Sequence, residues 1–172
     1  WSIEARFLGD AGYLASDSGS VQVRVVETAG YAIVVQGKIS SSEGLLSHNK
    51  TANFVYDQLR SRGLLAADIK YFNYDTGQPG VDGVPLKAEI RKAIIQWAKN
   101  KMNAKPANLY IVMVDHGFDE VFYIHPTTIT SAELASWLTT LQGRLTGQAA
   151  VQEMVLLLGF CRSGSFTDEL SG

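Results

Sequence analysis

The sequence predicts an α/β fold whose main domain is a mainly parallel sheet with helices on both faces. Four runs, at 31–37, 69–74, 109–114 and 154–160, are predicted to be buried strands, and the first and third have the continuous hydrophobicity of strands that are covered on both faces. Amphipathic helical stripes separate these runs, and this strand–helix alternation is typical of parallel crossovers. With 46% hydrophobic and 19% charged residues, the 172-residue chain can bury a core of this kind.

Residues 1–27 follow a different pattern and are expected to form a short β segment. Apolar and polar residues alternate in "SIEARF" and again in "VQVRVV" at 21–26, with the turn-rich loop "DAGYLASDSGS" at 10–20 between them. Because two strands rarely form a stable unit alone, we expect this segment to pack on the main domain or on another domain. Residues 28–30 are then a linker to the main domain at 31–172.

Three helices are expected between the strands, and each has a recognisable boundary residue. Gly63 ends the helix that begins at 48, Pro85 suits the first turn of the second, and Thr130 with Glu133 forms a capping box for the third. A short hairpin strand, "EVFYI", is expected before the third helix and ends at the turn-forming pair "HP".

Composition excludes several classes of function. A net charge of −2 offers no basic field, so no nucleic-acid partner is expected. No apolar run approaches the roughly 20 residues of a membrane span. The single cysteine rules out a disulfide within the chain. The chain begins at Trp1 without a signal-peptide pattern, so we expect it to be a piece of a longer, multidomain protein.

A histidine and the single cysteine follow the third and fourth strands. Ligands and chemistry gather at the carboxyl ends of parallel strands, which is where His116 and Cys161 stand. If the two strands are neighbours, their axes lie about 4.8 Å apart. An imidazole can then take the thiol proton or stabilise the thiolate. The backbone N–H groups of Gly117 and Cys161 are the expected donors to a developing oxyanion. The alternative is a buried cysteine that acts as a small hydrophobe.

Other polar residues near the strand ends are weaker candidates. His48, at the start of the first helix, and Ser163, after the thiol, are expected to line a substrate site, although capping or packing would also explain His48. Strand alternation places Asp115 on the face opposite His116. A side chain of the loop after the first strand, Ser40 or Ser41, is an open alternative for orienting the imidazole.

No metal site is predicted. Asp75 and Asp82 lie in a Gly/Pro-rich loop, but their spacing does not match an EF-hand. Asp119 and Glu120 follow Gly117 and are interpreted as solvated hairpin charges.

The motifs "VMVDHGF" (112–118) and "LLLGFCRSGSF" (156–166) resemble those of the caspase-like cysteine peptidases, and within them the legumain-like branch. The resemblance spans about 31–166 and implies a three-layer caspase/legumain-like sandwich, with the short β segment preceding it. It implies hydrolysis of peptide or protein substrates through a thiol acyl-enzyme, without metal or cofactor. Carried over by position, Cys161 is the nucleophile, His116 the base and Gly117 an oxyanion donor.

Two positions depart from the legumain pattern. Gly159 stands where legumain relatives usually have an acidic residue, and Ser47 stands where they often have an arginine before His48. Cleavage after asparagine is therefore not expected. The strands that normally complete the substrate pocket follow the nucleophile, so the domain is expected to be truncated at its C-terminus.

Residues 1–27 resemble the last two strands of a bacterial immunoglobulin-like repeat, through the "GDAGY" loop and the Val-rich strand after it. This resemblance implies a multidomain bacterial protein of the cell surface or the extracellular space, and the peptidase can then be self-processing.

Two other functions remain open. One is a catalytically degenerate caspase-like domain that serves as a binding or spacer module of a surface protein. The other is an α/β-hydrolase with a cysteine nucleophile, because "GFCRS" partly resembles a nucleophile elbow. That fold places its histidine after the nucleophile, whereas His116 precedes Cys161.

Overall fold

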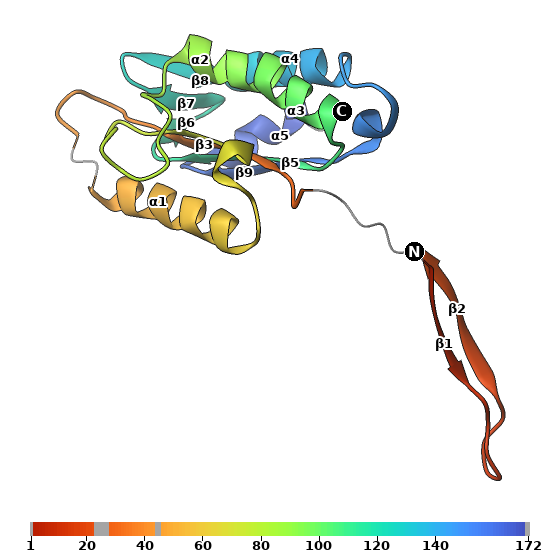
Figure 1. Ribbon diagram of the computed structural model, residues 1–172. Coiled ribbons are helices and arrows are strands. Elements are labelled where there is room, and N and C mark those ends of the chain that lie inside the picture. Colours follow the sequence, from red (N-terminus) through yellow and green to blue (C-terminus); the bar gives the residue numbers. More distant parts are fainter. Residues whose placement is uncertain (1, 23–27, 44–45, 171–172) are drawn as a thin grey trace.

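The computed structural model describes residues 2–22, 28–43 and 46–170 (Figure 1). It confirms the predicted α/β class. The central sheet has four parallel strands in the order β4-β3-β5-β9. These strands are β3 (Tyr31–Gln36), β4 (Ile69–Phe72), β5 (Leu109–Val114) and β9 (Met154–Gly159), and each falls within one of the predicted apolar runs.

Three of the strands end in line at one edge of the sheet. Gln36 of β3 pairs with Val114 of β5, and Val114 pairs with Gly159 of β9. The residues that follow each strand therefore enter the same region, as the carboxyl-end rule requires.

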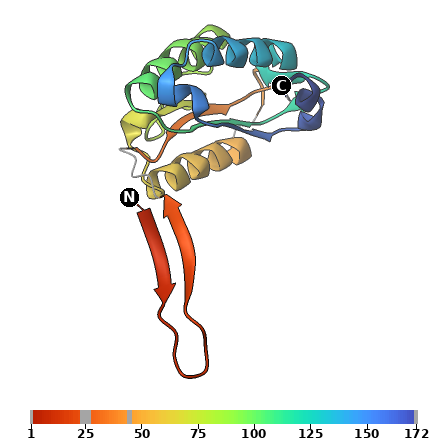
Figure 2. The same ribbon diagram turned by 90° about the vertical axis from the view of Figure 1, so that its right-hand side faces the viewer.

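Helices cover both faces of the sheet, which confirms the layered arrangement (Figures 1 and 2). Helix α1 (Leu46–Ser61) lies on one face. On the other face lie α4 (Ser131–Gln142) and a continuous helix made of α2 (Lys87–Lys92), the π-helical segment Ala93–Ala98 and α3 (Lys99–Ala104). Alternation along β3 serves both layers: Ile33 and Val35 join the larger core under α2–α4, and Ala32 and Val34 join the core under α1.

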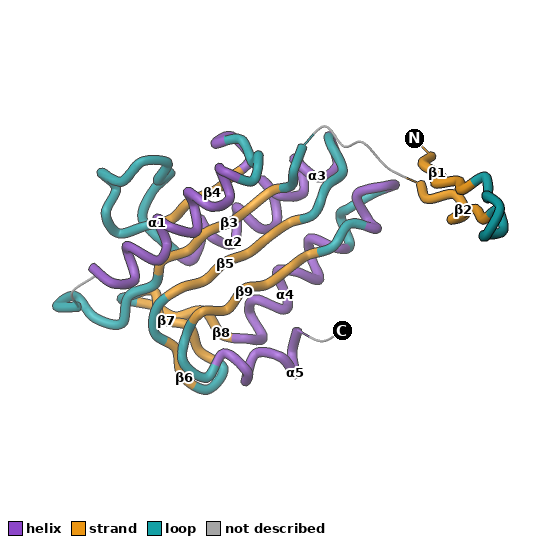
Figure 3. Tube along the Cα trace, turned by 90° about the horizontal axis from the view of Figure 1, so that it is seen from below, coloured by secondary structure: helices purple, strands orange, loops and turns teal. Residues whose placement is uncertain are grey.

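Strand β9 differs from the expectation of a strand that is covered on both faces. It is an edge strand, and Figure 3 shows α1 over β3 and β4 with β9 beyond it. Leu157 is 51% exposed and Leu158 only partly buried. Beside them an apolar groove of about 480 Å³ runs between α1 and β9, with Phe54 and Val112 in its lining. The apolar run predicted the strand correctly but not its position at the edge.

The chain forms a small antiparallel sheet in the segment between β5 and α4. It contains β6 (Gly117–Phe118), β7 (Val121–Ile124) and β8 (Thr127–Thr130). The prediction of one hairpin strand located β7 and missed β8. An isolated bridge between Lys38 and Ile124 joins this sheet to the segment after β3.

The predicted helix boundaries are confirmed at two of three positions. Thr130 and Glu133 form the complete capping box of α4. Gly63 adopts φ +97° just after α1, a conformation that glycine accepts at little cost. Pro85 does not lie in the first helical turn, because Leu86 is still extended and α2 begins at Lys87.

Short helical elements complete the main domain: 3₁₀ turns at Ala66–Asp68, Gly147–Val151 and Ser163–Phe166, and α5 (Thr167–Leu170). Within the described ranges, none of the helices has both the length and the apolar character that a bilayer crossing needs.

The N-terminal segment is an antiparallel hairpin of β1 (Ser2–Phe7) and β2 (Ser16–Gln22) (Figure 1). The first predicted strand is confirmed. The second begins at Ser16, so half of the predicted loop is strand, and most of "VQVRVV" lies outside the described residues. Among residues 4–20, all except Gly9 are exposed, so these residues bury no face against the main domain. Of the two expected arrangements, packing on another domain stays a prediction.

Candidate functional site

The segments after β5 and β9 emerge side by side. Val114 and Gly159 are the last pair of the β5–β9 ladder, and the N–H of Asp115 donates to the Gly159 carbonyl at 3.4 Å. The predicted adjacency of the third and fourth strands is therefore confirmed. The backbone that carries His116 and the backbone that carries Cys161 enter one region at the carboxyl edge of the sheet.

Gly117 touches the backbone at the cysteine. A Cβ built at this position would lie 2.8 Å from the Cys161 carbonyl oxygen and 3.0 Å from Cε2 of Phe160. The N–H of Tyr123 donates to the His116 carbonyl, so the next pair, Gly117 with Phe122, is a non-hydrogen-bonded pair. The Gly117 N–H therefore points away from β7. A glycine is required at position 117 because the Phe160 ring and the Cys161 carbonyl lie too close for a side chain, and not because the backbone makes a tight turn.

Cys161 is accessible at the start of the next loop. It is exposed, and its thiol makes no hydrogen bond to any residue in the described part of the chain. Its backbone N–H likewise has no acceptor there. Arg162 follows in the left-handed region, with φ +58°, and the Ser163 N–H donates to the Phe160 carbonyl to close the turn that contains the cysteine. Ser163, two residues after the thiol, is partly buried.

His116 belongs to a group of four side chains that we term the histidine–carboxylate cluster: Glu43, His48, Asp115 and His116. The Nε2 atom of His116 lies 3.4 Å from Glu43 Oε1 and 3.8 Å from Asp115 Oδ1. The Nδ1 atom of His48 lies 2.7 Å from Asp115 Oδ1 and 3.3 Å from Glu43 Oε1. The two imidazoles pack edge to face, with ring centroids 4.9 Å apart.

His48 reaches this cluster because α1 begins close to the edge where β3 and β5 end. Its side chain is 25% exposed, and that of His116 is 42% exposed. The structure therefore brings together the predicted His48 and His116, and His116 keeps the more open position.

Asp115 was predicted on the face opposite His116, and that prediction is wrong. Strand β5 ends at Val114, and the backbone bends at Asp115, so side-chain alternation no longer applies. Instead the Asp115 carboxylate is fully buried beside both imidazoles.

Glu43 is the residue that sequence reasoning missed. It lies in the polar loop after β3, where Ser40 or Ser41 had been the candidates to orient His116. Ser40 instead faces Ser42, with their hydroxyl oxygens 3.3 Å apart. The Ile39 N–H donates to Glu43 Oε2 and turns the other oxygen toward His116. The only sequence signal was a carboxylate in a loop after a buried strand, which is too common to single out.

The two carboxylates of the cluster have opposite pKa shifts. Burial raises the pKa of Asp115 to about 7, and the neighbouring Glu43 charge adds to this. Burial also acts to raise the pKa of Glu43, but the Ile39 N–H, the neighbouring Asp115 carboxyl group and the two imidazoles outweigh it and leave the pKa lowered. Glu43 is therefore ionised more readily than Asp115, and its carboxylate supplies the negative charge that faces the imidazoles.

The loop after Cys161 is tied to the β6–β7 hairpin. The Glu120 N–H donates to Ser165 Oγ at 2.7 Å, and the Arg162 guanidinium pairs with Asp119. The same guanidinium lies over the Phe118 ring at 4.7 Å. The Asp119 carboxylate and the Glu120 backbone N–H thus connect the two loops, and both residues are exposed, as the prediction of solvated hairpin charges requires.

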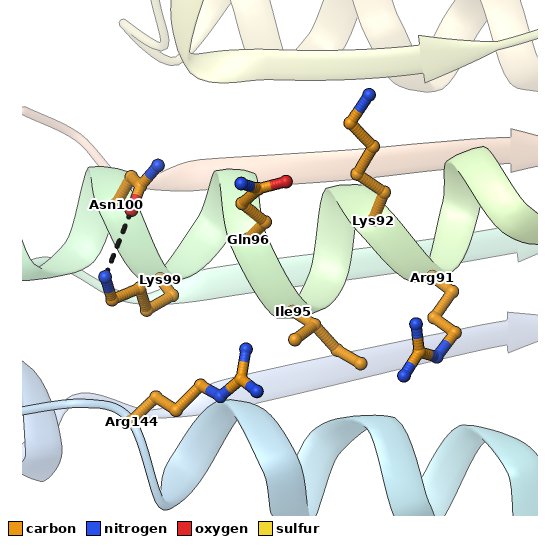
Figure 4. A pocket seen from close by; sticks show the side chains of 7 residues that line it. All are labelled: Arg91, Lys92, Ile95, Gln96, Lys99, Asn100 and Arg144. Carbon is orange, nitrogen blue, oxygen red and sulfur yellow. Dashed lines mark hydrogen bonds between the residues drawn. The ribbon is translucent and has the colours of Figure 1, made fainter.

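A cavity of about 660 Å³ lies away from these loops, between the continuous helix at 87–104 and the end of α4 (Figure 4). Its lining includes the cationic side chains of Arg91, Lys92, Lys99 and Arg144, and no residue of the strand-end loops. It is separate from the candidate site.

Comparison of the sequence with protein-family models and with curated proteins finds no match.

Proposed function

We propose that the protein is a cysteine endopeptidase that uses Cys161 and His116 to hydrolyse peptide bonds. One observation carries the proposal. The loops that bear the thiol and the imidazole leave adjacent strands in register, and Gly117 packs directly on the Cys161 backbone. Nucleophilic catalysis by a thiol requires an imidazole near it, and the structure supports this with an exposed thiol on one strand-end loop and, on the adjacent one, an imidazole that has its own carboxylates.

Each residue then has a defined role. His116 accepts the thiol proton, and the Cys161 sulfur attacks the peptide carbonyl to form an acyl-enzyme. The proton passes to the leaving amine, and water hydrolyses the thioester to release the acid and restore the thiol. The N–H groups of Gly117 and Cys161, which have no acceptor among the residues that the structure describes, are proposed to bind the oxyanion.

Glu43 is proposed as a positioning residue. In catalytic triads a carboxylate fixes the orientation of the imidazole and stabilises its charged form. The contact between Glu43 Oε1 and His116 Nε2 fits this role and leaves Nδ1 for the exchange of the proton. His48, which packs against His116, and Ser163, two residues after Cys161, are proposed to line the substrate site.

The finer features of fold and origin are also proposals. The resemblance at 31–166 supports a three-layer caspase/legumain-like sandwich, and the β1–β2 hairpin is compatible with the end of an immunoglobulin-like repeat. On that basis we propose a domain of a multidomain, extracellular or surface-attached bacterial protein that acts on peptides or proteins, its own chain included.

The test is the reactivity of the thiol. At about pH 6 a free cysteine is almost entirely protonated, so a thiolate held by an imidazole should react with iodoacetamide much faster than free cysteine does. Peptide-based thiol traps that vary the residue on the acyl side then report specificity, with Cys161→Ala as the unlabelled control. Reaction no faster than that of free cysteine would reject the peptidase.

A non-enzymatic binding or spacer module is the second candidate. The observation that favours it is that the thiol makes no hydrogen bond within the described residues, while His116 Nε2 is engaged by carboxylates. Catalytic contacts often tighten only when substrate binds. Slow alkylation together with a normally folded domain would favour this second function.

A further inference from the structure

The histidine–carboxylate cluster contains more donor atoms than a catalytic base needs. One ligand atom from each of its four side chains lies within 4.8 Å of every other. For four ligands about 2.1 Å from a metal, a tetrahedron has edges of about 3.4 Å. The four separations given above, between 2.7 and 3.8 Å, bracket that value.

A second observation concerns the buried atoms of this cluster. Glu43 Oε1, His48 Nδ1 and both oxygens of Asp115 are inaccessible to solvent and have no partner in hydrogen-bond geometry. The close approach of His48 Nδ1 to Asp115 Oδ1 does not satisfy that geometry. Unpaired buried polar atoms cost free energy unless something compensates them, and here Glu43 Oε1, His48 Nδ1 and Asp115 Oδ1 lie within 3.3 Å of at least one other member of the set.

We propose that this cluster binds a divalent transition-metal ion, and that the ion is Zn²⁺. Two imidazoles with two carboxylate oxygens form a nitrogen–oxygen set that zinc accepts in four-coordinate geometry. Magnesium and calcium prefer six or more oxygen ligands, and no thiolate belongs to the set. A dication would also compensate the two carboxylates that are held together at the strand ends.

Sequence spacing does not indicate this site, because its ligands come from three separate places. Glu43 lies in the loop after β3, His48 in the first turn of α1, and Asp115 with His116 directly after β5. Only the parallel alignment of β3 and β5 and the entry of α1 at the same edge bring them together.

The bound ion would also act as a regulator. This part of the inference rests on the proposed peptidase function. Zn²⁺ on Nε2 prevents His116 from holding a second proton, so the imidazole can no longer keep the proton taken from Cys161. We therefore expect Zn²⁺ to slow both alkylation of the thiol and any peptide hydrolysis.

The binding test uses the Cys161→Ala protein, which removes the thiol as a competing ligand. Calorimetric titration with Zn²⁺ should give one site per chain, and Co²⁺ should produce the visible absorption of a four-coordinate nitrogen–oxygen site. Because loss of even an outer-shell partner lowers metal affinity by about 10–100-fold, His48→Gln and Glu43→Gln should each weaken binding by at least as much. His125→Gln, which changes the histidine outside the cluster, should bind as the parent does.

Circular dichroism checks that the variants fold, and the two ligand variants cover the case in which one does not. Absence of Zn²⁺ binding, or equal affinity in the His125 and His48 variants, would overturn the site. In the wild type, Zn²⁺ binding that leaves alkylation of Cys161 unchanged would overturn only the regulation. A thiol that is slow without metal would reject the peptidase and leave the metal site standing.

Discussion

Replacing Gly117 by alanine tests the contact that joins the two strand-end loops. The added methyl group would lie 2.8 Å from the Cys161 carbonyl oxygen and would overlap the Phe160 ring. Phe160 cannot withdraw easily, because it is 8% exposed and packs between Phe122 and Phe166, with ring centroids 5.0 and 5.1 Å away.

The expected magnitude follows from this packing. Overfilling a well-packed core costs about 1–3 kcal/mol, and the backbone oxygen on the other side offers no flexible end that could move. The gain of about 0.4–1 kcal/mol that alanine brings by restricting the unfolded chain offsets only part of it. We expect Gly117→Ala to lower the free energy of unfolding by about 1–2 kcal/mol overall.

Urea unfolding followed by tryptophan fluorescence measures this difference, since Trp137 is buried in the core. Gly164→Ala is the matched control, because a Cβ at Gly164 in the same loop meets no atom within 4 Å. The control should stay within about 0.5 kcal/mol of the parent. Equal stability of the two variants would refute the close approach of β6 to the Cys161 backbone, and with it the joint placement of the two loops.

Two further predictions concern the rest of the domain. The pKa of Glu133 is lowered, because the Lys87 ammonium and the helix cap outweigh the effect of burial. The stability that the Glu133–Lys87 pair contributes is therefore present above the unfolded-state pKa of about 4.3 and is lost as the pH falls below it. Glu133→Gln keeps a capping amide but loses the charge. We expect a loss of less than about 1 kcal/mol at neutral pH that shrinks as acid protonates the Glu133 carboxylate, measured in urea titrations at several pH values, and a constant difference would contradict this. Gly80→Ala places a side chain at φ +81° and within 2.6 Å of the Tyr56 ring, so we expect it to lower the free energy of unfolding by at least about 1–2 kcal/mol. The control Gly83→Ala adds its methyl group in open space and should lower the free energy of unfolding little. Similar melting temperatures for the two variants would argue against the docking of this loop on α1.

The parallel sheet was predictable because its strands are mostly apolar and alternate with amphipathic helices. The same signal could not distinguish an edge strand from a central one, since Leu157 is as apolar as Val112 beside it in the ladder. In the N-terminal hairpin, alternation was assigned to "VQVRVV", but pairing begins earlier, in the polar segment from Ser16. The alternation of apolar and polar residues does not by itself determine at which residue an exposed strand begins.

The candidate site was predictable where it depends on strand ends and not where it depends on loop paths. His116, Gly117 and Cys161 follow directly from the carboxyl-end rule. Asp115 was misplaced because alternation was extended one residue beyond β5, past the bend. Glu43 was missed because its contact with His116 is made by a loop that folds back across the sheet edge.

The attachment of the cysteine loop to the β6–β7 hairpin has a mechanical consequence. Ser165 and Arg162 connect the segment after the thiol to the segment after the imidazole. A partner that pulled the exposed hairpin tip away from the cysteine loop would have to break both contacts, so the tip is where an outside molecule could reach the loop that carries the sulfur.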